Sequence, residues 1–166
     1  MEIKCVPALT DEFDLLYIRR RNGWSDLRIV AKDVDFTATI SHTFSDPIAD
    51  LAEFCGSLLE GRSPCFVRLY DEPGAMAIKA WIYSEQKHIA RFEIWDGLEW
   101  EQLPPDGHLV FSVDLKIQQF VGLVFRQLDK VRWLYREKSF QRDRDEFPSA
   151  PFEALEQLLS LYSSSA

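Results

Sequence analysis

Alternating hydrophobic and polar residues predict a strand-rich segment over residues 13–44. Leucine, isoleucine, alanine and aromatic residues recur at every second position, with polar or charged residues between them. A period of two is typical of strands that have one buried face. The pair Asn22-Gly23 lies between two such runs and predicts a tight hairpin turn. In this register His42 shares the buried face with Phe44, which favours a hydrogen-bonded structural histidine over a ligand.

The next segment changes to a spacing of three and four residues and predicts a helix over 46–60. Its hydrophobic residues form one continuous stripe, as expected for a helix that packs on a core. Asp46 can cap the free amide groups of the first turn, and Gly61 can end the helix. The opposite face includes Asp50 and Glu53, and we expect it to meet solvent.

Alternation returns after this helix and predicts strands at 64–70, 75–84, 86–95 and 108–115. The connections between successive runs are too short for the crossovers of a dozen or more residues that a parallel sheet needs. We therefore expect antiparallel hairpins. Residues 98–101 lie between two turn signals and are either a short strand or a loop.

Two further amphipathic helices are predicted in the last third of the chain. The first covers 116–137 and ends in a basic section that suits the negative end of the helix dipole. A charged connector follows at 138–148. The last helix lies within 149–166, with its hydrophobic stripe over 151–162. We expect this helix to pack on its own chain, and exchange onto a second subunit is the alternative.

These elements predict an α+β fold. We expect a curved, mostly antiparallel sheet of about seven strands, with two main helices packed on one face and an appended C-terminal helix. The 166 residues, 46% of them hydrophobic, suit one domain with a substantial core. The expected organisation is an α+β domain over 1–137, the connector over 138–148, and the C-terminal helix with a frayed tail over 149–166.

Charge and composition narrow the classes of partner. The chain has 27 acidic and 19 basic residues, a net charge of −8, which disfavours nucleic acid as a partner. No apolar run reaches the roughly 18–20 residues that span a bilayer, so no membrane partner is expected. The first residues lack the apolar core of a secretion signal, and Cys5, Cys55 and Cys65 lack CxxC spacing. We therefore expect a cytoplasmic protein with reduced thiols.

Motifs for catalysis and cofactor binding are missing from the sequence. It contains no G-x-S-x-G, no glycine-rich phosphate loop and no histidine or cysteine pair at metal-ligand spacing. We therefore expect no cofactor, no metal and no enzymatic activity. One alternative is a small-molecule-binding or hydrolytic enzyme with a cavity between sheet and helices, using His88 or His108 with nearby acids. Another is a structural protein that forms a homodimer through its last helix.

The segment from residue 95 to residue 101 carries two tryptophans among three acidic residues. Aromatic anchors surrounded by charge are typical of protein interfaces, because the rings supply binding energy and the charges supply steering. The alternative is that both tryptophans face the core. A second acidic pair lies in the turn that begins at residue 71. The candidate partner-binding residues are Trp95, Asp96, Glu99, Trp100, Glu101, Asp71 and Glu72.

Two short motifs fall at matching places in this order of elements. Asp35-Phe36 lies in the strand before the first helix, and Leu109-x-Phe111-x-Val113-Asp114 leads into the long helix. With these motifs, residues 27–130 resemble small immunity proteins of bacterial polymorphic-toxin systems, including the wall-associated toxin immunity type. Leu115 stands where those proteins often carry glutamine after the aspartate.

The resemblance implies a curved antiparallel sheet wrapped around helices, no catalysis, and tight binding to a toxin domain. An acidic immunity protein that faces a basic toxin domain would also account for the net charge, through electrostatic steering. We therefore expect a protein that neutralises a cognate bacterial toxin by covering its active surface. Whether it does so as a monomer or as a homodimer stays open at this point.

Overall fold

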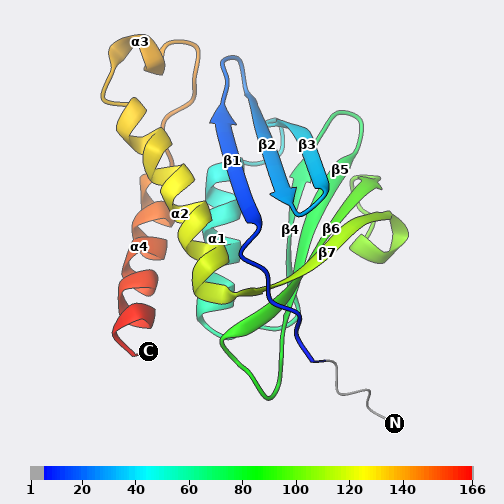
Figure 1. Cartoon of the computed structure of the whole chain (residues 1–166). Helices are drawn as coiled ribbons and strands as arrows, with labels where there is room; N and C mark the ends of the chain where they lie inside the picture. The colour runs from blue at the N-terminus through cyan, green and yellow to red at the C-terminus, as the bar shows by residue number, and fades with distance from the viewer. Residues whose placement is uncertain (1–5, 166) are drawn as a thin grey trace.

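A computed structural model describes residues 6–165 and confirms the α+β fold class. Within these residues seven antiparallel strands and the main helices follow one another in the predicted order (Figure 1). The strands form two sheets, of three and four strands, where the sequence predicted one curved sheet. The break lies at helix α1, which carries the chain from the end of the first sheet to the start of the second.

The first sheet is an antiparallel meander with strand order β1-β2-β3. Its strands are β1 (Phe13–Arg19), β2 (Trp24–Ala31) and β3 (Val34–Ser41). Asn22 and Gly23 have φ values of 58° and 76°, so the predicted hairpin turn is confirmed. The prediction that the strand-rich segment continues to residue 44 is wrong. Because β3 ends at Ser41, Phe44 lies in a loop and is half exposed instead of facing the core.

The second sheet is also an antiparallel meander, with strand order β4-β5-β6-β7. Its strands are β4 (Cys65–Tyr70), β5 (Ala75–Ile82), β6 (Ile89–Leu98) and β7 (His108–Lys116). A short 3₁₀ helix, η1 (Pro104–Asp106), precedes β7. The short connections thus form the predicted hairpins. Strand β6 starts and ends three residues later than predicted, so residues 99–103 form a loop.

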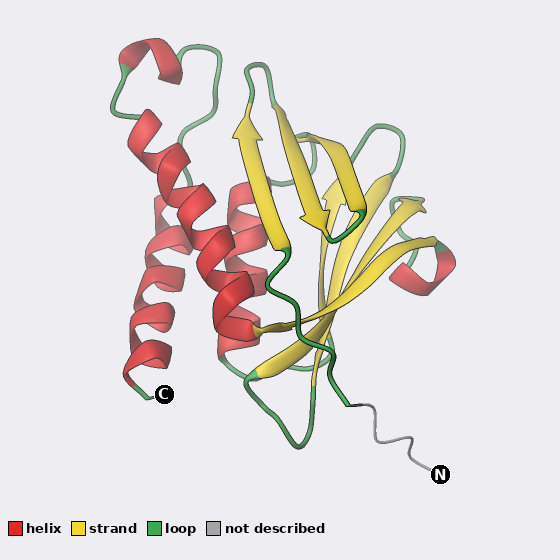
Figure 2. Ribbon diagram, viewed as in Figure 1, coloured by secondary structure: helices red, strands yellow, loops and turns green. Residues whose placement is uncertain are grey.

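The α helices lie together on one side of the sheets, and the short η1 lies on the other side (Figure 2). They are α1 (Pro47–Leu59), α2 (Ile117–Leu134), α3 (Lys138–Gln141) and α4 (Ser149–Ser164). Helix α4 packs against α1 and α2 of its own chain, on the side away from the sheets. The predicted connector contains the single turn α3. None of the helices over residues 6–165 is long and apolar enough to cross a membrane.

One hydrophobic core joins both sheets and the helices. Phe120 of α2 lies at its centre, fully buried, with its ring stacked at 4.1 Å on Phe92 of β6. Phe13 of β1 and Phe54 of α1 contact the same ring at centroid distances of 6.1 and 6.0 Å. Because one side chain touches both sheets and both main helices, a shift of any of these elements disturbs the packing of the others.

Helix α4 is held by close packing on the other helices. Phe152 is fully buried and stacks on Phe125 of α2 at 5.1 Å, with an angle of 18° between the rings. On α1, Gly56 lets α4 approach closely: a Cβ at this position would lie 3.3 Å from Leu158. The C-terminal helix therefore packs in cis, as expected from its hydrophobic stripe.

We predict that Phe152→Ala lowers the free energy of unfolding by about 3–5 kcal/mol, because it removes a large buried ring and leaves a cavity beside Phe125. Leu161 on the same helix is 68% exposed, so Leu161→Ala is the matched control and should change stability by less than about 0.5 kcal/mol. Urea unfolding followed by circular dichroism measures both. Equal effects of the two substitutions would show that α4 does not dock as described.

Candidate functional site

Three segments that are distant in sequence meet beside the ends of β3 and β4. They are the loop 42–46 before α1, the β4–β5 turn and the loop 99–103 after β6. The ring of Phe44 contacts Tyr70 at 5.0 Å and Trp100 at 4.6 Å. We call these three side chains the aromatic cluster. Phe44 is 50% exposed and Trp100 43% exposed, so the cluster presents apolar area to solvent.

The loop that carries Phe44 is fixed at its last residue, Asp46, by an ion pair with the buried Arg19. Arg19 of β1 donates from Nη1 and Nη2 to the two carboxylate oxygens of Asp46, at 2.9 and 2.8 Å, while its Nε donates to the hydroxyl of Tyr135. Asp46 also caps α1 by accepting from the amide of Ile48, as the sequence predicted. Burial alone would lower the pKa of Arg19, but its bonds to Asp46 raise the pKa well above the ordinary value.

The same loop is fixed at its first residue, His42, by a short chain of hydrogen bonds. The Oγ of Ser25 lies 2.6 Å from Nε2 of His42 and 2.6 Å from the hydroxyl of Tyr17. Burial and the charge of Arg19 lower the pKa of His42. The prediction of a hydrogen-bonded histidine is confirmed. Although serine and histidine are paired here, Ser25 is fully buried, so a substrate cannot reach its oxygen in this conformation.

Glu72 connects the β4–β5 turn to the loop 42–46. Its Oε1 accepts hydrogen bonds from the hydroxyl groups of Thr43, at 2.7 Å, and Ser41, at 2.9 Å. These bonds lower the pKa of Glu72 and keep it charged. Glu72 therefore holds the β4–β5 turn against the loop 42–46 and also contributes a negative charge to the site.

Two other candidate carboxylates lie close to each other across the end of the second sheet. Burial raises the pKa of Asp71, and the charge of Asp96 raises it further. The turn is pressed against the end of β6: a Cβ at Gly74 would lie 2.7 Å from the carbonyl oxygen of Leu98. Glycine is needed there because any side chain would collide with this backbone.

The two candidate tryptophans have different environments. Trp95 of β6 is half-buried, and its Nε1 donates to Oε2 of Glu93 at 3.0 Å. It packs on a small buried cluster on the open face of the second sheet, away from the main core. This cluster consists of Ala75, Ala77 and Leu98. Trp100 instead belongs to the aromatic cluster, so the structure gives the exposed, anchor-like position to Trp100 alone.

The remaining candidates, Glu99 and Glu101, flank Trp100 and are exposed. Within residues 6–165, neither they nor Asp71, Glu72 and Asp96 form an ion pair with a basic side chain. Carboxylates without an ion-pair partner in this part of the chain thus lie in or next to the segments that form the aromatic cluster. We call the cluster and these five carboxylates the acidic aromatic surface.

Sequence reasoning missed Phe44, Tyr70 and Arg68 as parts of this site. Arg68 of β4 anchors the loop that carries Trp100, because its Nη2 donates to the carbonyl oxygen of Gln102 at 2.5 Å. Its guanidinium also lies 5.8 Å from the ring centroid of Phe66. The alternation of β4 could have placed Phe66, Arg68 and Tyr70 on one face, but it could not show what that face adjoins.

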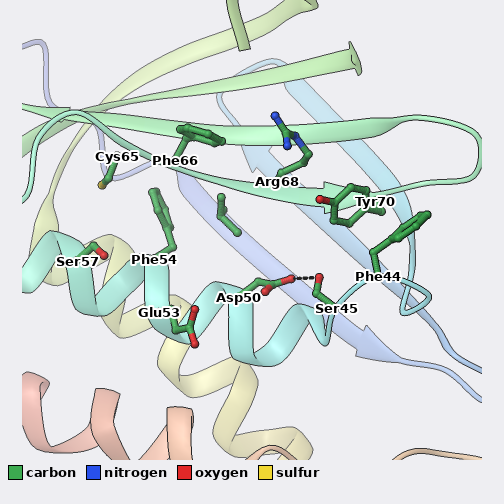
Figure 3. Close-up of a pocket in the computed structure, with 11 residues that line it drawn as sticks. Phe44, Ser45, Asp50, Glu53, Phe54, Ser57, Cys65, Phe66, Arg68 and Tyr70 are labelled. Carbon is green, nitrogen blue, oxygen red and sulfur yellow. Dashed lines mark hydrogen bonds between the residues drawn. The ribbon is translucent and has the colours of Figure 1, made fainter. Parts of the chain in front are cut away.

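A groove of about 340 Å³ opens between α1 and β4, beside the aromatic cluster (Figure 3). Asp50 and Glu53 of α1 form one wall, and Ser45 donates a hydrogen bond to Asp50. The polar face that was expected to meet bulk solvent therefore lines a concave site. The opposite wall comes from β4 and includes the free thiol of Cys65, whose pKa is raised by burial to about 11.

Of the two histidines of the enzyme alternative, His108 pairs with Asp96 across β6 and β7, whereas His88 lies at the other end of β6. His88 lies exposed in the β5–β6 turn, and His108 lies exposed at the start of β7. No hydrogen bond between either imidazole and a carboxylate is present in the described residues. In the same part of the chain no group of three or more histidine, cysteine, aspartate or glutamate side chains is placed to hold a metal ion. Cys5 lies outside the described residues, and Cys55 is a free, buried thiol.

Comparisons of the chain with protein families, with curated proteins and with solved structures found no match in any of the three. They neither support nor oppose the resemblance to immunity proteins, which rests on the order of elements and the two motifs described above. The functional argument therefore starts from the geometry and charge of the acidic aromatic surface.

We predict that Asp46→Ala lowers the free energy of unfolding by about 3–5 kcal/mol, because it leaves the buried Arg19 unpaired and removes the cap of α1. The matched control is Asp35→Ala, since Asp35 makes a similar two-pronged contact with Arg28 at the surface. That substitution should have a far smaller effect, because exposed pairs are screened by solvent. Chemical denaturation of both variants measures the difference, and similar losses would contradict a structural role of the buried pair.

We predict that substitution of the two candidate tryptophans lowers the stability of the protein to different extents. Trp95→Ala should lower the free energy of unfolding by about 2–3 kcal/mol, because its ring covers the small buried cluster, whereas Trp100→Ala should lower it by less than about 1 kcal/mol. Thermal or urea unfolding of the two variants decides this. A large loss for Trp100→Ala would mean that this ring supports the fold and is not free to serve as a binding anchor.

Proposed function

We propose that this chain is a non-enzymatic immunity protein that binds a basic bacterial toxin domain and neutralises it by covering its active surface. One observation carries the proposal: segments far apart in sequence bring together an exposed aromatic cluster, and the five candidate carboxylates, none of them in an ion pair within residues 6–165, lie in or next to these segments. The element order and the two family-like motifs support the same class.

The composition of the surface suits protein recognition. Partly exposed rings such as Trp100 and Phe44 gain free energy when a partner removes them from water, and residues of this kind dominate the energetics of protein interfaces. The surrounding carboxylates accelerate encounter with a basic partner and disfavour acidic ones. The net charge of −8 acts in the same direction over a longer range.

The surface is also held in shape before binding. The Arg19–Asp46 pair, the Ser25–His42 bond and the two hydroxyl bonds of Glu72 fix the loop that carries Phe44. A rigid surface loses little conformational entropy on association, which favours tight binding. Neutralisation by covering an active surface needs rigidity and complementary charge, and no bond is made or broken by this chain.

The direct test is binding to the protein encoded immediately upstream of this gene. Titration calorimetry should show a tight complex, and co-expression should relieve any toxicity of that protein. Trp100→Ala should weaken the complex at least tenfold, mostly through faster dissociation. Glu99→Gln and Glu101→Gln should slow association and reduce its dependence on salt.

Trp133→Ala is the matched control, because Trp133 is an exposed tryptophan on α2, outside the acidic aromatic surface. It should leave affinity unchanged. The proposal fails if no basic protein encoded beside this gene binds the chain, or if Trp133→Ala and Trp100→Ala weaken binding equally.

A further inference from the structure

Strand β4 is an edge of the second sheet. It pairs with β5 on one side only, through residues Cys65 to Tyr70, and no other strand of the described chain pairs with its free side. In an edge strand about half of the backbone N–H and C=O groups point away from the sheet. These groups can bond to an added strand from another molecule.

The free side of β4 borders the groove described above. The strand forms one wall and α1 forms the other, as Figure 3 shows for Phe66 on the strand and Phe54 on the helix. Proteins commonly cover such edges with a helix, a loop or a bulge. Here a volume of about 340 Å³ stays open along the edge, within the range of sites that take ligands.

The charge of the groove selects the kind of segment that fits. Glu53 forms no ion pair within residues 6–165, and Asp50 receives only the hydrogen bond from Ser45. The one cation in the lining is Arg68, which is engaged with the carbonyl oxygen of Gln102. The helix wall therefore carries two carboxylates without an ion-pair partner in the described chain, and the single positive charge of the lining lies on the opposite, strand wall.

The alternation of β4 predicts how an added strand would be oriented. Val67 and Leu69 are buried on the side that α1 covers, so Phe66 and Tyr70 lie on the opposite, open face. Side chains of an added strand would alternate in the same way. Those on the helix side would face Asp50 and Glu53, and those on the other side would extend the row of Phe66 and Tyr70.

We propose that the groove receives an extended, basic segment of the protein partner, which pairs with β4 as a fifth strand of the second sheet. The inference rests on the proposed function in taking the partner to be a basic protein. It adds the mode of recognition: lysine or arginine at every second position towards α1, and apolar residues between them. Antiparallel pairing with β4 of a second copy is disfavoured, because it would bring two sets of Asp50 and Glu53 together.

The test uses a blocked hexapeptide of alternating lysine and valine with the full chain. It should bind, and it should slow hydrogen exchange of backbone amides in β4 at least tenfold at saturation. The same peptide with N-methyl groups on alternate backbone nitrogens should bind at least tenfold more weakly, since it keeps the charge but loses the strand bonds. A peptide with glutamate for lysine should not bind.

Protein variants locate the site. Glu53→Gln should weaken binding of the lysine peptide severalfold and reduce its salt dependence. The control Asp33→Asn removes an exposed carboxylate from the β2–β3 turn, at the opposite end of β3 from the groove, and should have no effect. The inference is overturned if the N-methylated peptide binds equally well, if protection falls outside β4, or if the free chain already forms a dimer through β4.

Results for the groove and for the proposed function can be told apart. Trp100 does not line the groove, so Trp100→Ala should spare peptide binding while it weakens the toxin complex. A toxin complex without any peptide binding would overturn the groove inference and leave the immunity function standing. Peptide binding without any toxin complex would overturn the proposed immunity function and leave the groove inference standing.

Discussion

An ion pair between the buried Arg19 of β1 and the partly exposed Asp46 at the start of α1 determines how the first sheet meets the helices. The guanidinium also bonds to the hydroxyl of Tyr135 beyond the end of α2, and the carbonyl oxygen of Arg19 accepts from Arg144. One residue thus links β1, the start of α1 and the chain that leads to α4. A buried pair adds little net stability over a hydrophobic replacement, but loss of one partner is costly. Its effect here is to specify one position for the first turn of α1, and with it the loop that carries Phe44.

That loop joins the two surfaces that carry function in our proposals. Phe44 and Tyr70 belong to the aromatic cluster and also line the groove between α1 and β4. A partner that covers Trp100 can therefore continue into the groove over the rings of Phe44 and Tyr70. The same fixed loop forms one edge of both sites, so the ordering cost of both is met during folding and not during binding. This continuity is the structural reason for assigning both surfaces to one protein partner.

Local patterns of the sequence predicted the elements well, because capping, hairpin turns and one-sided burial depend on neighbouring residues. The structure confirms the cap at Asp46, the turn at Asn22-Gly23 and the one-sided burial of β1. The division into two sheets was not predictable in this way, since it depends on where α1 packs. Phe44 was misplaced because the strand period was extended past Ser41, where the chain turns to bond Glu72 instead. Trp95 follows the alternation of β6 onto the face opposite Phe92 and Ile94, whereas Trp100 lies in the loop after β6, and no local pattern shows that this loop meets Phe44.

Asp71 and Asp96 of the candidate surface have opposite effects in the free chain and in the proposed complex. Burial and the neighbouring charge of Asp96 raise the pKa of Asp71, which shows that ionisation of this carboxyl is opposed in the free protein. Within residues 6–165 neither carboxylate forms an ion pair with a lysine or an arginine. A basic partner would supply the missing positive charge, so the unfavourable interaction in the free chain becomes favourable binding energy in the complex. A surface that is electrostatically incomplete by itself is what a protein dedicated to one basic partner requires.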